Sequence, residues 1–386
     1  ILDFENRRTR YGLSPFFPDV DTRFKFMAIT AARTRQFPQT NCAFFLQSVD
    51  EIDDPERCYP LTSDDFSRLN PNTNTAPILR NRRDAELIKS IYNQVPVLVE
   101  HNGSQTKDSW PIEYMQMVNM TRASSLFRTR IELQETEGAW RLSGNTWESG
   151  EGRWLPLYEG KMVQAYDHRA ADIVVSAKNQ HRPAQPLPAT LDQSSDPEWF
   201  PNPQCRIYEA ETNEVADHAW LIGFKDVTAP TNMRTMIATV FPQTGVGNTL
   251  PLILPAIPKP PETDDEAELQ AHFDQVEKLL QEFSQSGPLL LANLNSIILD
   301  FAARQKVQGQ HLNWFIVEQL PIVQRGEYLK RQFGIKSATE VIMPLVLELT
   351  YTAHDMAPFA RDMGHVDENG EVLPPFPWDE DRRLRL

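Results

Sequence analysis

Residues 156–170, PLYEGKMVQAYDHRA, form the stretch around which the rest of this chain is organised. Charged, hydrogen-bonding and aromatic side chains gather here behind a Trp-Leu-Pro lead-in, at a density that few other stretches reach. These side chains are Glu159, Lys161, Tyr166, Asp167, His168 and Arg169. Three interpretations are open: recognition of phosphates and bases, metal-assisted cleavage through the Glu-x-Lys pair, and a structural strand and turn that is polar.

The length and composition of the chain indicate the broad class of protein. A chain of 386 residues, 40% hydrophobic and 24% charged, is typical of a soluble globular protein with two domains and an ample core. No apolar run approaches the ~18–20 residues of a membrane helix, so we expect no membrane partner. The three scattered cysteines favour a reducing, cytoplasmic location and argue against zinc and disulfides. The first residues, ILDFENRR, lack an initiator Met and a signal-peptide pattern, so we expect a piece of a longer polypeptide.

The net charge of −15 argues against a general nucleic-acid coat. Basic residues nevertheless occur in clusters, and a folded chain can gather such clusters on one face while its back stays acidic. The clusters are Arg7–Arg10, Arg80–Arg83, Arg122–Arg130 and Arg304–Lys306. Local binding of a polyanion therefore stays open.

The periodicity predicts an α+β fold with a mixed N-terminal part, a β-rich middle and a helical C-terminal closure. Residues 21–32 and 41–47 alternate like paired strands, whereas residues 62–69 and 82–92 have the start signals and spacing of helices. Residues 70–80, NPNTNTAPILR, predict a loop. From Trp140 onward, tryptophans, glycines and short alternating runs predict many strands and turns.

The C-terminal part predicts helices. Residues 264–283 form an amphipathic helix with an almost wholly acidic outer face, and residues 289–305 form a second helix. Residues 312–317 are strand-like, and residues 341–351 are hydrophobic enough for a buried element, in which Pro344 would interrupt a helix near its start. We expect the Pro- and Asp-rich tail from Gly364 to wrap around the protein.

Catalytic motifs are missing from the sequence. It contains no Gly-rich turn after a strand for AdoMet, no P-loop, no HExxH and no GxSxG. The one enzymatic candidate is Glu159-Gly160-Lys161, which would suit a magnesium-dependent nuclease if an Asp stood roughly ten to thirty residues earlier. No Asp lies between Asp108 and Asp167. We therefore expect no catalytic, metal-binding or cofactor-binding residue, with the nuclease kept as an alternative.

Long ordered stretches of the chain resemble the C-terminal half of large single-chain DNA adenine methyltransferases of restriction-modification and phage-defence systems, namely the type IIG, type ISP, BREX-like and DISARM-like proteins. The stretches that carry the resemblance are DFENRR, DTRFKF, NPNTNTAPILRNRRDAELIKSIY, PLYEGKMVQAYDHR, AWLIGFKDVTAPTNMRT, LNSIILDFAARQKVQGQHLNWFIVEQLP, LELTYTAHDMAPFARDMG and PPFPWDEDRR. The run Leu294–Pro321 also resembles the closing helix and strand of a type I specificity-subunit recognition domain.

The resemblance implies a division of labour. The AdoMet-binding methyltransferase domain would lie upstream, and this chain would supply sequence-specific recognition of double-stranded DNA for N6-adenine methylation. It implies residues 1–139 as a segment supporting that upstream domain, residues 140–325 as the recognition domain, and residues 326–386 as a C-terminal closure. Expected partners are double-stranded DNA, the upstream methyltransferase domain and other restriction or defence proteins. A scaffold that binds defence proteins through the acidic helix 264–283 stays a second alternative.

Three loops supply the candidate DNA-binding side chains, because Arg suits guanine, Asn and Gln suit adenine, and basic groups suit phosphates. The candidates are Lys161, His168, Arg169, Asn232, Arg234, Thr235, Arg304, Lys306, Gln310 and His311. For residues 166–169 an internal network, in which Asp167 orients His168 or Arg169, is an equal alternative.

Overall fold

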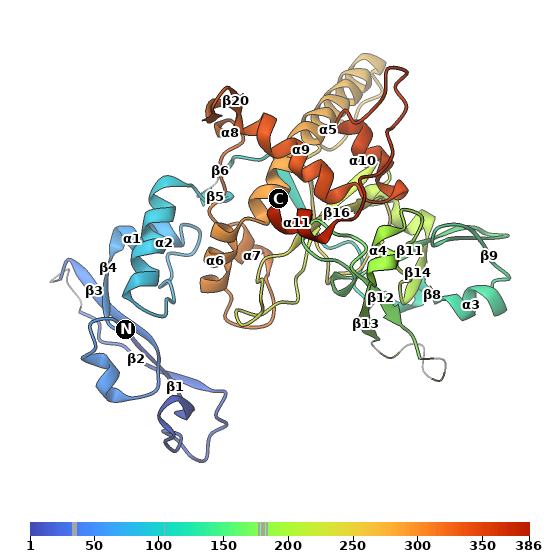
Figure 1. Cartoon of the computed structure of the whole chain (residues 1–386). Helices are drawn as coiled ribbons and strands as arrows, with labels where there is room; N and C mark the ends of the chain where they lie inside the picture. Colours follow the sequence, from blue (N-terminus) through green and yellow to red (C-terminus); the bar gives the residue numbers. More distant parts are fainter. Residues whose placement is uncertain (33–36, 104, 177, 179–181, 183) are drawn as a thin grey trace. The chain divides into compact units, whose positions relative to one another are not determined.

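The secondary structure is α+β, as the sequence predicts, in a computed structural model that describes residues 1–32, 37–103, 105–176, 178, 182 and 184–386 (Figure 1). The chain divides into two compact units. The first unit comprises residues 1–109, 301–309 and 314–324, and the second comprises residues 110–300, 310–313 and 325–386. Residues 110–139, expected in the first segment, belong to the second unit, where β7 (Ile112–Met115) and β8 (Phe127–Thr129) pair with later strands.

The first unit is built on a four-stranded sheet of order β2-β1-β3-β4. Its strands are β1 (Leu2–Glu5), β2 (Lys25–Ala28), β3 (Gln39–Leu46) and β4 (Tyr59–Thr62). The two expected strands exist, but they are not partners, since β1 lies between them, antiparallel to β2 and parallel to β3. A hairpin of β5 (Val99–Asn102) and β6 (Gln105–Asp108) follows later in the unit.

Two helices of the first unit begin where the sequence predicts. In α1 (Ser63–Leu69), the Thr62 hydroxyl accepts from the backbone of Asp65 while the Asp65 carboxylate accepts from the backbone of Thr62, so the first turn is capped in both directions. The Asn81 side chain caps α2 (Arg82–Gln94) in the same region, and the helix ends just before Pro96.

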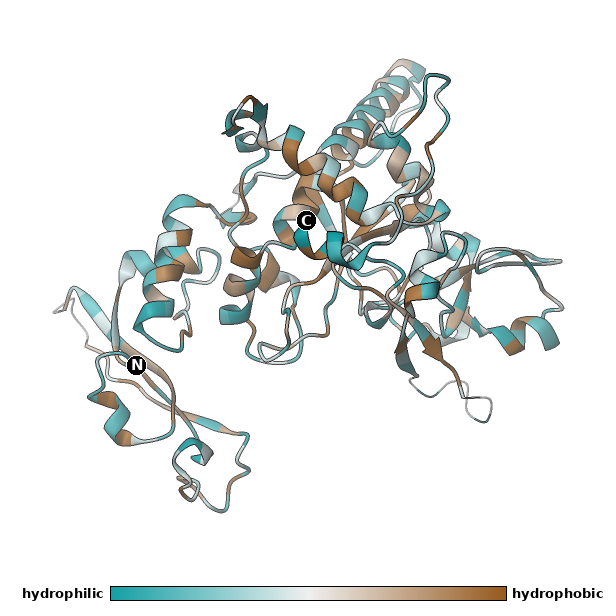
Figure 2. Cartoon of the chain, viewed as in Figure 1, coloured by the Kyte–Doolittle hydropathy of each residue, from teal (hydrophilic) through white to brown (hydrophobic). Residues whose placement is uncertain are grey.

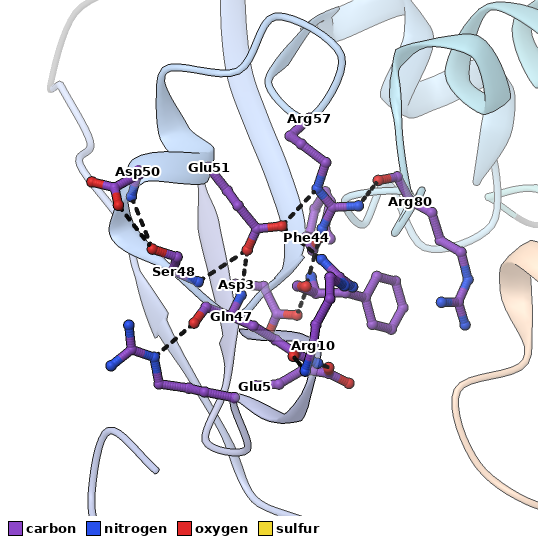
Figure 3. A network of polar contacts seen from close by, with 12 residues as sticks. Asp3, Glu5, Arg10, Phe44, Gln47, Ser48, Asp50, Glu51, Arg57 and Arg80 are labelled. Carbon is purple, nitrogen blue, oxygen red and sulfur yellow. Dashed lines mark hydrogen bonds and ion pairs between the residues drawn. The ribbon is translucent and has the colours of Figure 1, made fainter. Parts of the chain in front are cut away.

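A buried polar network holds β1 and β3 to the segment that follows them (Figure 3). The Glu51 carboxylate accepts from the backbone N–H groups of Gln47 and Ser48, at 2.5 and 3.0 Å, and pairs with Arg10 at 2.6 Å and Arg57 at 3.3 Å. A buried carboxylate is tolerated when such charged and backbone partners surround it. These arginines of the first unit are therefore occupied by internal partners.

The second unit contains a six-stranded and a four-stranded sheet. The first has order β8-β14-β11-β10-β9, with β17 paired to β11, and the second has order β16-β15-β18-β7. Their remaining strands are β9 (Trp140–Ser143), β10 (Thr146–Ser149), β11 (Gly152–Tyr158), β14 (Cys205–Tyr208), β15 (Trp220–Phe224), β16 (Ala238–Pro242), β17 (Gly245–Val246) and β18 (Leu252–Pro255). This arrangement confirms the predicted β-rich region. The buried rings of Tyr158 and Phe241 stack between the two sheets' strands, with centroids 5.6 Å apart.

The smaller elements of the second unit complete its surface. They are α3 (Arg130–Glu135), the pair β12 (Ala171–Val174) and β13 (Gln185–Pro188), α4 (Leu191–Ser195), α8 (Glu327–Lys330), the pair β19 (Gln332–Phe333) and β20 (Lys336–Ser337), α10 (Ala357–Asp362) and α11 (Glu380–Arg385). Regular structure is sparse between α10 and α11.

The long helices correct several predicted bounds. Helix α5 (Glu266–Leu294) absorbs the start of the second predicted helix, which begins anew as α6 (Ile297–Lys306). Hydrophilic residues predominate in the N-terminal part of α5, whereas its last residues are buried (Figure 2). Helix α9 (Ala338–Thr350) runs through Pro344, so the predicted interruption is wrong. Residues 314–317 form the one-turn helix α7 rather than a strand.

In the part of the chain that the structure describes, no single helix is both long and apolar enough to cross a bilayer. Helices α5 and α6, bent by 63° at their junction, meet the combined requirement of length and apolar composition only as a pair.

Candidate nucleic-acid interface

The connection between β15 and β16, residues 225–237, is held at its base like a hairpin. Phe224 and Ala238 are partners in the antiparallel ladder, and the Lys225 N–H continues it by donating to the Ile237 carbonyl at 2.9 Å. Both strands are buried along almost their whole length, so the ladder fixes where this loop leaves the sheet. The loop carries three of the candidate residues, Asn232, Arg234 and Thr235.

Residues 310–313 lie against the first half of this loop. The backbone carbonyl of Asp226 accepts a hydrogen bond from the Leu312 N–H at 2.7 Å. The Asp226 carboxylate lies 2.7 Å from His311 Nδ1. The Thr228 N–H donates to the Gln310 carbonyl at 3.0 Å. Two candidate clusters that are some 80 positions apart, Asn232–Thr235 and Gln310–His311, are thereby brought together. The His311 side chain remains 56% exposed.

The second half of the loop is anchored on α6. The buried Asp300 carboxylate accepts from the N–H groups of both Thr235 and Met236, at 2.7 and 2.9 Å. Thr235 itself is fully buried, and its hydroxyl donates to the Ala229 carbonyl. This corrects the expectation for Thr235: its side chain closes the loop instead of facing solvent.

Arg234 is half-buried: its guanidinium helps to anchor the loop, and part of its side chain is exposed. Its guanidinium donates to the Asn295 carbonyl at the junction of α5 and α6, and its Nε lies 3.6 Å from Asp300. Asn232 is exposed, and Met233 is 94% exposed, so the tip of the loop projects from an anchored base. An exposed tip on a fixed base is the geometry that lets a loop enter a groove without losing much conformational entropy.

The turn at residues 159–162 contacts the same loop base. The Gly160 N–H donates to Thr249 Oγ1 at 3.1 Å, and the backbone carbonyl of Thr249 accepts from the Asp226 N–H. A Cβ on Gly160 would lie 2.4 Å from that carbonyl oxygen, so only glycine allows this approach. Lys161, 24% exposed, is therefore placed beside the β15–β16 loop, with its amine 2.9 Å from Glu159.

Lys225 is a functional candidate that the sequence reasoning missed. Its side chain passes Gly160, with Cγ 3.8 Å from the position of a Cβ there. Burial lowers the pKa of its amine, and within the described residues this amine has no hydrogen bond or ion pair. Lys161 and Lys225 thus flank one glycine, an arrangement suited to a phosphate. The signal was available in the sequence, since Lys225 directly follows the apolar strand WLIGF.

His168 and Arg169 lie elsewhere and are both buried. The Arg169 guanidinium donates to the carbonyls of Asp196, Trp199, Ser194 and Thr352 at 2.7–3.0 Å. His168 Nε2 lies 3.0 Å from the Asp355 carboxylate. Both side chains therefore have internal partners, but these are not the expected Asp167, whose carboxylate accepts from the Arg169 backbone N–H. Because both side chains are buried, a DNA contact by either is a corrected expectation.

Arg304 and Lys306 belong to the first unit, whereas the loop at residues 225–237 belongs to the second. The Lys306 amine donates to the Leu69 carbonyl and to Asn70 Oδ1, both at 2.5 Å. These two acceptors hold the amine inside the first unit, which weakens its case as a phosphate contact. Burial lowers its pKa to about 7. Arg304 is half-exposed at the end of α6.

Metal chemistry gains no support from the arrangement of donors. Over the described ranges, no three His, Cys, Asp or Glu side chains come together as ligands for an ion. Glu159, the expected ligand of the nuclease alternative, is buried and paired with Lys161.

A comparison with protein-family models finds no match for this chain, and a comparison with curated proteins finds none either.

Proposed function

We propose that this chain recognises a specific sequence in double-stranded DNA, as the target-recognition part of an N6-adenine DNA methyltransferase from a restriction-modification or phage-defence system. One observation carries the proposal: the loop at residues 225–237 is anchored at both ends, with His311 held at its start by Asp226, and it exposes Asn232 and part of Arg234. Asn and Arg are the side chains that discriminate adenine and guanine in the major groove.

The proposed contacts divide by role. Lys161 and Lys225 bind the phosphate backbone and set the register, whereas Asn232, Arg234 and His311 contact base edges. Phosphate contacts are needed because the whole chain is acidic, so long-range attraction to DNA is weak and local cations must provide the affinity. The catalytic step and AdoMet belong, in this proposal, to an upstream domain, which follows from the resemblance of the sequence.

Selection from a pool of random duplexes tests the proposal. The chain should enrich one short motif, and the exposed changes Asn232→Ala and His311→Ala should alter that motif while circular dichroism stays unchanged. A full-length parent enzyme carrying Asn232→Ala should then methylate adenines in an altered set of sites. Failure of the chain to enrich any motif over random duplex would reject the proposal.

A further inference from the structure

A cavity of about 230 Å³ lies within the first unit, between the loop at residues 69–79, α2 and the segments at residues 302–308 and 315–319. Its lining is mainly apolar, with Leu79, Ile88 and Ile316 among the contributors. The loop is the NPNTNT stretch, which has no part in the proposed groove contacts. A cavity of this size is smaller than the roughly 300–1,000 Å³ of pockets for drug-sized ligands, so its ligand is small.

One edge of the cavity offers a hydrogen-bond donor beside an acceptor. The Lys306 amine lies 2.5 Å from Asn70 Oδ1, and it also lies 5.2 Å from the centre of the Tyr92 ring. Lys306 and Tyr92 are the only ionisable side chains among the described residues that line the cavity. No carboxylate is present there to neutralise the amine, and burial lowers its pKa to about 7.

A second polar group in the wall lacks a partner. Gln319 is 4% exposed, its amide nitrogen donates to the Phe315 carbonyl at 2.8 Å, and its amide oxygen accepts no hydrogen bond in the described structure. A buried acceptor without a partner costs about 1–3 kcal/mol, which a ligand N–H could recover. Phe315 also lines the cavity, and its ring is 56% exposed.

We propose that this cavity binds a purine base. A purine is flat and apolar on both faces, which suits the aliphatic lining and the exposed Phe315 ring. Its edge carries a hydrogen-bond acceptor next to an N–H donor, and these complement the Lys306 amine and Asn70 Oδ1. Nitrogen-bound hydrogens of the same ring system can supply the missing donor to Gln319.

Two sources could supply the base: a free purine, or a nucleotide extruded from duplex DNA. The second source rests on the proposed function, because it requires DNA on this chain. Binding of a free base requires no DNA, so the proposal for the cavity and the proposal for the recognition loop are tested by separate experiments.

Calorimetric titration of the whole chain with adenine and with the soluble 6-oxopurine hypoxanthine tests the site. We expect one of them to bind, and Phe315→Ala and Lys306→Met to weaken that binding at least tenfold. Phe315 is exposed, so its replacement leaves folding intact even if the Lys306 variant is unstable. The control Lys330→Met removes a lysine that is 72% exposed in the other unit, and it should bind as the unaltered chain does.

Three results would overturn the proposal: no binding of either purine, equal binding of cytosine, or binding that Phe315→Ala leaves unchanged. A second titration identifies the source, using duplexes with 2-aminopurine, whose fluorescence rises when it leaves the base stack. A rise that Phe315→Ala abolishes assigns an extruded base to the cavity. If free purines bind and no such rise occurs, the cavity takes a free base only.

Discussion

The Asp300 carboxylate accepts a hydrogen bond from the Thr235 N–H at 2.7 Å, and through this contact α6 holds the loop that we propose enters the DNA groove. The same oxygen also accepts from the Met236 N–H at 2.9 Å. Two backbone donors of the loop thus depend on one buried side chain, and the position of the exposed tip depends on them.

Replacing Asp300 should therefore loosen the loop before anything else. Asp300→Ala leaves two buried N–H groups without an acceptor, and each such group costs about 1–3 kcal/mol of unfolding free energy. Asp300→Asn keeps an oxygen that can accept from both N–H groups, so its free energy of unfolding should fall clearly less. Urea denaturation of the two variants checks this, with Glu268→Ala on the exposed face of α5 as a control. Equal losses for Ala and Asn would contradict the anchoring role.

Such anchoring could not be predicted from the sequence. Helix starts are local, so Thr62 and Asp65 allowed α1 to be placed from four residues of chain. The contact between Asp300 and Thr235 joins positions 65 residues apart and depends on how α6 packs against the sheet. Sequence patterns could therefore suggest the loops but not which of them meet.

The burial of Arg169 is a second feature that could not be predicted from the sequence. An Arg in a polar stretch predicts a surface cation, but here the guanidinium satisfies backbone carbonyls from two distant segments, around residues 194–199 and at Thr352. Five N–H donors in a planar fork make Arg suited to that task. Exposure is decided by the partners that the fold supplies, and composition contains no information about them.

Gly160 should tolerate no side chain. In Gly160→Ala the new Cβ would lie 2.4 Å from the Thr249 carbonyl oxygen, which belongs to backbone and has little room to move. We expect a loss of about 1–3 kcal/mol from overpacking. Gly309→Ala is the matched control, since nothing lies within 4 Å of its Cβ position. Thermal denaturation that gives both variants the same midpoint would contradict the close approach.

Lys161 and Lys225 should contribute to the salt dependence of DNA binding. Each phosphate contact to duplex DNA adds about −0.9 to the slope of log K against log salt concentration. We expect Lys161→Ala and Lys225→Ala each to make the slope shallower by about 1 and to weaken binding to all sequences alike. Fluorescence anisotropy from low to moderate salt measures the slope, and Asn232→Ala should leave it unchanged. A slope that neither lysine affects would place the phosphate contacts elsewhere.

Lys306 should make the stability of the protein depend on pH in a defined direction. Its pKa falls from 10.5 to about 7 on folding because burial disfavours the charged amine. Between these values the unfolded chain binds more protons than the folded one, so the free energy of unfolding rises with pH, by up to about 1.4 kcal/mol per pH unit from this group. Below pH 7 both states are protonated and the contribution is flat. Urea titrations at several values between pH 6 and pH 10 should show this rise in the unaltered chain relative to Lys306→Met, and parallel curves for the two proteins would mean that the amine stays hydrated.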